Sequence, residues 1–359
     1  MPFHTPDRST PPLLALTMGE PAGVGPELAL KVWNEARAKG RAPDYTLVLY
    51  ADPAAIAASA SRLGLSDPCQ VVSTPAEAVG LWPERLPVIA VPLQRPVEPG
   101  RPDPANATAV IGAIEQAVAA VVRGEAAAVV TNPIAKSVLY KAGFAHPGHT
   151  EFLAELASRL VGNGPWRPVM LLASDELRVV PLTIHIPLAE VPKTLSPELI
   201  IETARILNDA LVRDFGLGSE RRPRIAVTGL NPHAGEDGSM GTEEQTIIAP
   251  AIETLRQQGL DVTGPHPADT LFHAEARARY DAAIAMYHDQ ALIPIKTLAF
   301  DRAVNVTLGL PFVRTSPDHG TAFDIAGTGK ASAASLSAAL DLAARMAVNR
   351  AKAAAHDPR

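Results

Sequence analysis

Cysteine is almost absent from this chain of 359 residues, in which Cys69 is the only one. Neither an intrachain disulfide nor a cysteine-based zinc site can form from a single thiol. Such a composition is typical of a reducing compartment, so we expect a cytoplasmic protein. Cys69 follows an Asp-Pro pair and has no neighbouring group that would activate a thiol, and we interpret it as structural.

Long hydrophobic runs and an excess of positive charge are lacking as well. No stretch approaches the roughly 18 uninterrupted apolar residues of a membrane helix, and residues 1–12 have no apolar core of the signal-peptide kind. The chain carries 32 basic and 38 acidic residues, a formal net charge of −6. We therefore expect neither a membrane nor a nucleic acid as a partner, although a few local cations could hold a small anion.

Three glycine-rich signatures are missing from the chain. The dinucleotide fingerprint Gly-x-Gly-x-x-Gly of the Rossmann fold does not occur, and Gly327-Thr-Gly-Lys330 lacks the upstream glycine of a phosphate-binding P-loop. The Gly-x-Ser-x-Gly turn of serine hydrolases is absent too. A nucleotide cofactor would have to be held in another way, and we assign no residues to it.

What the chain does contain is a regular alternation of short apolar runs and amphipathic stretches. The apolar runs are predicted to be strands buried on both faces: 13–17, 45–50, 88–91, 126–131, 169–173, 179–185, 224–228, 282–286 and 304–307. The stretches between them are predicted to be helices: 26–39, 53–63, 105–123, 151–160, 197–215, 243–258 and 331–350. This alternation predicts an α/β fold with a largely parallel sheet.

Three histidines follow strand-like runs in polar surroundings. They are His185 in Thr-Ile-His-Ile-Pro, His233 in Asn-Pro-His-Ala-Gly-Glu and His288 in Met-Tyr-His-Asp-Gln. Ligands bind at the carboxyl ends of strands in open α/β sheets, and imidazole is the commonest metal ligand in proteins. A single histidine is more often a hydrogen-bonded structural residue, but three in matched contexts favour an open, catalytic metal site. Asp289 is a candidate for an additional or outer ligand, and Asp269 for an acid near the site.

Two further segments could hold an anion at the start of a helix. Residues 17–27, Thr-Met-Gly-Glu-Pro-Ala-Gly-Val-Gly-Pro-Glu, lead from a strand into a helix through glycines that allow close backbone approach. The alternative for this segment is a tight turn alone. His149 and Thr150 precede the predicted helix 151–160, where Thr150 is a candidate N-cap and both side chains could meet a phosphate or carboxylate. The alternative there is capping alone.

The segment between Lys296 and Asp324 places single polar residues among apolar ones. Lys296, Asn305 and Arg314 are its candidates for contact with an anionic substrate. Arg314 can hold a carboxylate or phosphate through two parallel hydrogen bonds. Lone cations are usually surface charge, but the apolar neighbours favour a functional interpretation here.

These motifs together resemble the 4-hydroxythreonine-4-phosphate dehydrogenase family of pyridoxal phosphate biosynthesis. The matching segments are 17–27, Pro-Gly-His-Thr-Glu-Phe at 147–152, Gly-Leu-Asn-Pro-His-Ala-Gly-Glu at 229–236, Pro-Ala-Asp-Thr-Leu-Phe at 267–272, Ala-Met-Tyr-His-Asp-Gln at 285–290, Asn-Val-Thr-Leu-Gly-Leu-Pro-Phe-Val-Arg-Thr-Ser at 305–316 and Asp-His-Gly-Thr-Ala at 318–322. The resemblance runs from about Leu13 to Asn349, nearly the whole chain.

The resemblance implies a two-domain α/β/α fold similar to the isocitrate and isopropylmalate dehydrogenases, which bind NAD without the Rossmann fingerprint. We predict a first domain from residues 1–145 and 291–359 and a second from 146–290, with the active-site cleft between them. The resemblance also implies a homodimer with a shared active site. In it, His185 and His233 of one subunit and His288 of the other would hold a divalent zinc, cobalt or magnesium ion.

By the same resemblance, the residues that contact the phosphorylated substrate would be His149, Thr150, Lys296, Asn305 and Arg314. The implied reaction oxidises 4-phosphohydroxy-L-threonine at C3 with NAD or NADP and then removes carbon dioxide to give 3-amino-2-oxopropyl phosphate. The metal would lower the pKa of the C3 hydroxyl and stabilise the enolate left by decarboxylation. Lys296 or a metal-bound water is the candidate for the catalytic proton steps, with Asp269 and Asp289 orienting the metal or balancing its charge.

Two kinds of alternative stay open. Related dehydrogenases act on 4-phospho-D-threonate, on 4-phosphoerythronate or on a cyclic diol dicarboxylate, and Thr131-Asn-Pro-Ile-Ala-Lys136 is a candidate for the segment that discriminates among these substrates. The alternative of another class is a non-catalytic metal-binding protein. That alternative gives no reason for Lys296 and Arg314 to accompany three histidines.

Overall fold

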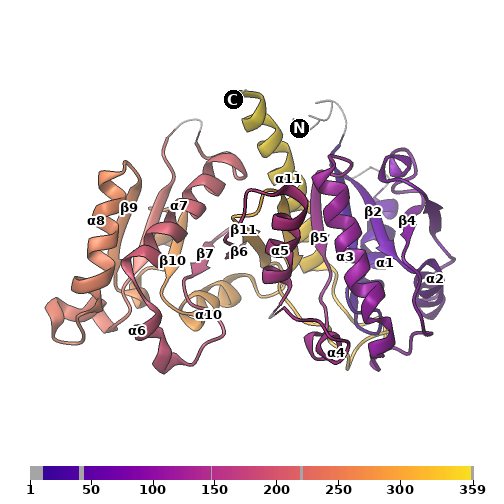
Figure 1. Ribbon diagram of the computed structural model, residues 1–359, viewed down its shortest axis with the longest axis horizontal. Helices are drawn as coiled ribbons and strands as arrows, with labels where there is room; N and C mark the ends of the chain where they lie inside the picture. Colours follow the sequence, from indigo (N-terminus) through magenta and orange to yellow (C-terminus); the bar gives the residue numbers. More distant parts are fainter. Residues whose placement is uncertain (1–10, 40–43, 147, 219–220, 357–359) are drawn as a thin grey trace. The chain divides into compact units, whose positions relative to one another are not determined.

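The computed structural model describes residues 11–39, 44–146, 148–218 and 221–356. The chain divides into two compact units, one formed by Met1–Pro168 with Leu310–Arg359 and the other by Val169–Gly309; Figure 1 labels most of their helices and strands. Most of the polar start of the chain and Pro147 lie outside the described residues.

The first unit contains six parallel strands in the order β3-β4-β2-β1-β5-β12. Its strands are β1 (Leu13–Thr17), β2 (Thr46–Ala51), β3 (Cys69–Val72), β4 (Leu86–Ala90), β5 (Ala128–Thr131) and β12 (Val313–Pro317). Its helices are α1 (Gly25–Ala38), α2 (Pro53–Arg62), α3 (Ala107–Val122), α4 (Lys136–Lys141), α5 (His149–Val161) and α11 (Ala334–His356), with short 3-10 turns at Pro75–Ala78 and Pro104–Asn106.

The central strands of this unit are covered on both faces. Every residue of β2, β5 and β12 is buried, as expected for a parallel sheet between helical layers. Helix α3 packs on β1, β2 and β5, and α11 packs on β12 and β5. By length and composition the stretch Pro104–Val122, which includes α3, could cross a membrane, but 56% of it is buried inside the protein, as in a core helix.

The second unit has the strand order β11-β6-β7-β10-β8-β9, in which β7, β10, β8 and β9 are parallel and β6 is antiparallel to both neighbours. Its strands are β6 (Val169–Ala173), β7 (Arg178–Pro181), β8 (Arg224–Thr228), β9 (Asp261–His266), β10 (Ala282–Ala285) and β11 (Val304–Leu308). Its α-helices are α6 (Val191–Thr194), α7 (Pro197–Arg213), α8 (Ala249–Gln257), α9 (Ala274–Arg277) and α10 (His288–Ala299). Shorter turns occupy Leu188–Glu190, Pro232–Gly238, Glu244–Ile248 and Ala268–Thr270.

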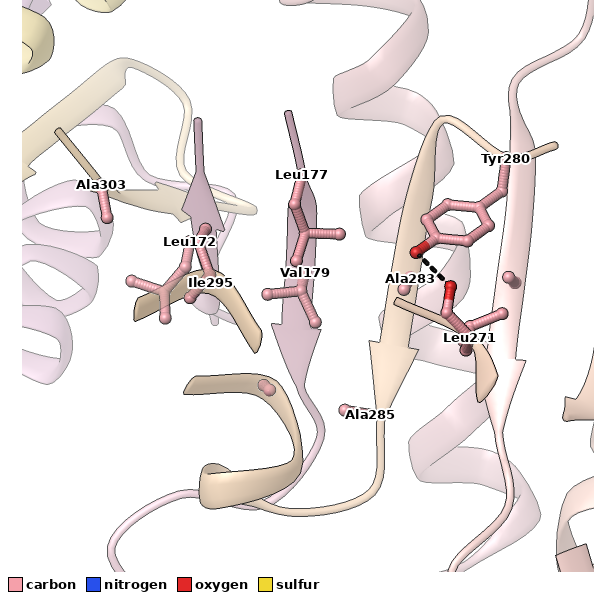
Figure 2. Packing of buried hydrophobic residues seen from close by; sticks show 11 residues of the cluster. Leu172, Leu177, Val179, Leu271, Tyr280, Ala283, Ala285, Ile295 and Ala303 are labelled. Atoms are coloured by element: carbon pink, nitrogen blue, oxygen red, sulfur yellow. Dashed lines mark hydrogen bonds between the residues drawn. The ribbon is translucent and has the colours of Figure 1, made fainter. Parts of the chain in front are cut away.

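A cluster of buried apolar side chains fixes α10 to the strands of the second unit. Ile295 of α10 packs with Leu172 of β6, Val179 of β7 and the alanines of β10, as Figure 2 shows. Burying a side chain of this size contributes about 1.5–3 kcal/mol. Because α10 begins at His288, this cluster also fixes the position of that histidine.

The predicted α/β class with a largely parallel sheet is confirmed, and so are most of the predicted strands. The strands β3, β9 and β12 and the helices α4, α6, α9 and α10 are not among the predicted ranges. Three of these elements lack the pattern used for prediction. The strand β12 (Val-Arg-Thr-Ser-Pro) and the strand β9 (Asp-Val-Thr-Gly-Pro-His) are not apolar runs, and the helix α10 contains Pro294. The predicted strand 179–185 is too long, because β7 ends at Pro181 and the chain then turns into a loop.

The predicted domain ranges and the compact units differ at both joins. The prediction placed residues 146–168 in the second domain and 291–309 in the first. In the structure α5 packs on α3 of the first unit, and α10 packs on β7 and β10 of the second. Packing of these two helices therefore sets the joins at Pro168 and Gly309.

Asp281 ties together the amino ends of three strands in the second unit. Its carboxylate accepts hydrogen bonds from the Arg221 guanidinium at 2.6 and 2.7 Å and from the backbone N–H of Arg224 at 2.7 Å. Its carbonyl oxygen accepts from the Arg178 guanidinium at 3.1 Å. Burial opposes the charge of Asp281, but these hydrogen bonds and the nearby arginines outweigh burial and lower its pKa to about 2.

We expect Asp281→Asn to reduce the stability of the second unit by about 1–3 kcal/mol at pH 7, because three hydrogen bonds lose their charged acceptor. The folded pKa of about 2 lies below the ordinary value of 3.8, so the contribution is present above about pH 4 and is lost as the pH falls toward 2. Urea unfolding followed by far-UV circular dichroism at several pH values measures this. Glu275→Gln, which removes an exposed ion pair with Arg279, is the control. Equal stability of wild type and Asp281→Asn at pH 7 would contradict the prediction.

Candidate active site

The three predicted histidines follow the carboxyl ends of three adjacent parallel strands. In the order β7-β10-β8, His185 comes four residues after β7, His288 opens α10 after β10, and His233 lies in the turn after β8. The prediction that each histidine follows a strand is confirmed. All three are accessible to solvent, since His185 and His233 are exposed and His288 is partly buried.

His185 and His288 lie side by side in the single chain. Their ring centroids are 5.8 Å apart, with 43° between the ring planes. Metal–nitrogen bonds of about 2.0–2.1 Å place the centres of two imidazoles on one ion about 5–6 Å apart. The two rings are therefore close enough to bind the same divalent ion.

The hydrogen bond between His288 and Asp289 favours metal binding by His288. Nδ1 of His288 lies 2.7 Å from Oδ1 of Asp289. Because a carboxylate only accepts, Nδ1 carries the proton and the lone pair of Nε2 is left for a ligand. Carboxylates that hold metal-binding histidines in this way orient the ring and raise its basicity. Of the two roles suggested from the sequence, an additional ligand or an outer partner, this contact favours the outer one, and the role of Asp289 stays a prediction.

His233 does not join the pair within one chain. Among the described residues, no three His, Cys, Asp or Glu side chains lie close enough together to hold a metal ion. The resemblance paired His185 with His233, whereas the chain itself places His185 beside His288. The complete metal set stays a prediction.

The turn that carries His233 is an unusual left-handed segment. Residues 233–237 all have positive φ, with values of 53° at His233 and 82° at Gly235. His185 also has a positive φ of 49°. Non-glycine residues in this region cost energy and persist where the surroundings hold them, often at functional sites. Two of the three histidines are therefore held in strained backbone.

Glu244 is the buried group that holds the start of this turn. Its Oε1 accepts the backbone N–H groups of Leu230 and Asn231 at 2.8 Å each, and its Oε2 accepts from the Asn231 side chain at 3.0 Å. The Asn231 amide also donates to Glu243 at 2.7 Å. These hydrogen bonds offset the strain of the turn. Sequence reasoning missed Glu244, because nothing in Gly-Thr-Glu-Glu marks one carboxylate as buried.

Arg314 is the second focus of polar groups, and it belongs to the first unit. It lies in β12, is 3% exposed, and donates to Thr131 Oγ1 from Nη2 at 2.6 Å and from Nε at 3.2 Å. Burial lowers its pKa to about 10, which still leaves the guanidinium charged at neutral pH. Thr131 ends β5, next to β12 in the sheet. The candidate discriminating segment 131–136 therefore begins in contact with Arg314.

His149 is the first residue of α5, and its Nε2 is buried without a hydrogen-bond partner. Burial, and then the charges of Arg314 and Lys136, lower its pKa well below the usual 6.5. A neutral ring near two cations is an environment that favours an anion. The prediction that Thr150 caps this helix is wrong, because the N-cap is Gly148. A Cβ at Gly148 would lie only 3.0 Å from Lys136 Nζ. The absence of a side chain at Gly148 therefore allows the Lys136 ammonium to approach the start of α5.

The remaining predicted residues belong to the second unit. Lys296 lies in the last turn of α10, with Nζ 5.5 Å from the centre of the Phe300 ring. Asn305 is half-buried in β11. Asp269 is exposed in the turn Ala268–Thr270. His149, Thr150 and Arg314 are in the first unit, so the predicted substrate residues are shared between the two units.

Comparison with known proteins identifies the family. A family model described as "Pyridoxal phosphate biosynthetic protein PdxA" matches residues 44–343. The chain belongs to this PdxA family. A 4-hydroxythreonine-4-phosphate dehydrogenase of Bradyrhizobium diazoefficiens is 58% identical over 341 residues, which are 93% of this chain and 96% of that protein. The resemblance inferred from the motifs is confirmed, and the chain is an enzyme of the oxidoreductase class.

Solved structures agree with this assignment. The crystal structure of a 4-hydroxythreonine-4-phosphate dehydrogenase from Klebsiella pneumoniae has a TM-score of 0.82 and 38% identity, covering 94% of this chain and 99% of that one. A terephthalate 1,2-cis-dihydrodioldehydrogenase from Burkholderia xenovorans has a TM-score of 0.61 and 27% identity, covering 93% of this chain and 98% of that one. The fold therefore also occurs in a dehydrogenase with a different named substrate.

We expect the His149 ring to stay neutral well below pH 6.5, because burial and two cations oppose its protonation. Proton NMR of the imidazole signals across an acid titration, assigned by their loss in His149→Gln, measures this. Lys136→Gln should raise the pKa of His149 by removing one of the charges. Lys141→Gln, at the other end of α4, is the matched control and should leave it unchanged. A titration of His149 near pH 6.5 would exclude the buried, cation-flanked environment.

Proposed function

We propose that this PdxA-family enzyme oxidises 4-phosphohydroxy-L-threonine at C3 with NAD or NADP and decarboxylates the product to 3-amino-2-oxopropyl phosphate, in pyridoxal 5'-phosphate biosynthesis. The observation that carries the proposal is the buried Arg314 guanidinium beside the partner-less Nε2 of His149. A desolvated cation next to a neutral ring is suited to a phosphate, which accepts hydrogen bonds from both. The 58% identity to a named 4-hydroxythreonine-4-phosphate dehydrogenase supports the choice of substrate.

The same residues suggest how the substrate is held. Arg314 would bind the phosphate while Thr131 fixes the plane of its guanidinium through two hydrogen bonds. His149 and Thr150, at the start of α5, would add donors at a helix N-terminus, where anions are favoured. Lys296 and Asn305 would contact the remainder of the substrate. Held at its phosphate end, the substrate would present its hydroxyl in a fixed orientation.

A divalent metal fits the histidines of the second unit. His185 and His288 are 5.8 Å apart by ring centroids, and Asp289 fixes the proton of His288 on Nδ1. Imidazole ligands favour zinc or cobalt over magnesium. A bound ion would supply a Lewis acid for the C3 oxygen and for the carbonyl that replaces it. Lys296 is our candidate for proton transfer, with Asp289 orienting His288 and Asp269 contributing negative charge nearby.

A homodimer with a shared active site is part of the proposal. His185 and His233 of one subunit and His288 of the other would complete the ligand set that one chain leaves open among its described residues. The same unit also exposes large apolar residues: Leu188 is 67% exposed, Ile293 64% and Phe300 77%. A second subunit covering them would remove that apolar surface from water. The single cysteine supports a cytoplasmic location.

The likeness to a terephthalate dihydrodiol dehydrogenase supports cyclic diol dicarboxylates as an alternative class of substrate. A carboxylate could occupy the position that we assign to the phosphate, because Arg314 binds either group. Phosphothreonate and phosphoerythronate would retain the phosphate and differ at the amino group. The segment 131–136 is our candidate for the discrimination, since Thr131 contacts Arg314 and Lys136 lies near His149.

We expect NADH or NADPH to form with 4-phosphohydroxy-L-threonine at a kcat/KM at least about tenfold above that with 4-phospho-D-threonate, a difference of about 1.4 kcal/mol. Absorbance of the reduced nicotinamide measures the rate for each substrate, and a cyclic diol dicarboxylate completes the panel. Equal or faster turnover of phosphothreonate would overturn the choice of substrate but leave the dehydrogenase class intact.

We expect chelation of divalent ions to abolish activity, and zinc or cobalt to restore it, because the C3 oxygen then loses and regains its Lewis acid. His233→Ala should lower kcat by at least about a hundredfold, corresponding to about 2.7 kcal/mol, without loss of fold by circular dichroism. His273→Ala, outside the predicted ligand set, is the control. If His233→Ala bound substrate and turned over at the wild-type rate, the metal-dependent mechanism would fail.

A further inference from the structure

Gln290 uses all the polar atoms of its side chain to join two strand ends. Oε1 accepts hydrogen bonds from Thr228 Oγ1 and from the backbone N–H of Met286, each at 2.7 Å. Nε2 donates to the carbonyl oxygen of Gly229 at 2.9 Å. Thr228 and Gly229 stand where β8 ends, and Met286 stands where β10 ends.

These two strand ends lead directly to two of the candidate metal ligands. The chain runs from Gly229 into the left-handed turn that carries His233, and from Met286 through one residue to His288. The backbone ladder between β8 and β10 ends at the pair Val227–Ile284. The Gln290 amide extends the connection beyond that pair, into the part of the sheet edge where the histidines emerge.

The segment that follows β7 is hydrogen-bonded to Met286 as well. Thr183, which is buried, donates from Oγ1 to the carbonyl oxygen of Met286 at 2.8 Å. Thr183 lies two residues before His185. Met286 is therefore bonded through its carbonyl to the segment that carries His185, and through its N–H to the Gln290 amide.

We propose that Gln290 is a positioning residue, whose amide fixes the placement of the His233 turn and of His288 relative to the sheet edge. The inference rests on the proposed function for the role of these histidines as metal ligands. An amide suits this position because it offers an acceptor and a donor at one end. In a dimer with shared sites, one Gln290 would set a ligand in each of two sites.

The test measures Co²⁺ binding by the visible absorbance of the ion, without substrate or turnover. Gln290→Met keeps the length of the side chain and removes all three hydrogen bonds. We expect its Co²⁺ affinity to fall about 10–100-fold, the usual effect of losing an outer group that orients metal ligands, with an altered absorbance spectrum. Gln257→Met, on the exposed side of α8, is the matched control and should bind Co²⁺ like wild type.

A double-mutant cycle separates the connection from a general loss of stability. Thr228→Val removes one of the hydrogen bonds to Gln290 from the strand side. If both residues act through this connection, the double variant should lose little more affinity than Gln290→Met alone, since coupled sites are not additive. Full additivity of the two losses would overturn the inference.

Amide hydrogen exchange of the metal-free protein gives a second, independent readout. In Gln290→Met the N–H of Met286 should exchange faster, as should the N–H groups of residues 229–231 and of His233, because their restraint is lost. The N–H of Leu182, which donates to Ala285 at 2.8 Å, is the internal control and should stay protected. Unchanged exchange and unchanged Co²⁺ affinity would overturn the inference while leaving the proposed function standing. If wild type failed to bind Co²⁺ through its histidines, the metal part of the proposed function would fall, and the exchange data would still decide the role of Gln290.

Discussion

Parallel pairing of β7, β10 and β8 is the constraint on which the candidate active site depends. Parallel strands bring their carboxyl ends to one edge, and burial on both faces leaves polar side chains to be placed beyond those ends. His185, His288 and His233 follow these three ends. The first unit obeys the same rule, since Thr131 closes β5 at the point where it meets Arg314.

The amino and carboxyl edges of the parallel strands in the second unit differ in their polar contacts and backbone conformation. At the amino edge, Asp281 binds arginines and a backbone N–H, which stabilises the start of the strands. At the carboxyl edge the backbone is strained, with positive φ at His185 and His233. The buried Glu244 and the partly buried Gln290 make hydrogen bonds to the backbone at this edge. The backbone strain is thus found at the edge that carries the histidines, as is common at functional sites.

The elements that could be predicted were those whose local pattern matches their environment. Apolar runs such as 282–286 became buried strands, and Ser196-Pro197 opened a helix as expected. The failures have a common cause, because β12 is fully buried although it contains Arg314, Thr315 and Ser316. Thr131 accepts hydrogen bonds from Arg314, and Ala339 accepts one from Thr315, and no local pattern carries that information. Helix α10 was missed for the same reason, since packing of Ile295 holds it despite Pro294.

The sequence by itself determined the α/β alternation, the family and the kinds of side chain available for chemistry. Motifs and composition are local properties, so they can be read along the chain. Only the tertiary structure decided which side chains meet. Arg314 contacts Thr131 across 183 positions of sequence, and His185 lies beside His288, with no third ligand-type side chain grouped with them among the described residues. Strand order and helix packing set these distances, and sequence separation says nothing about either.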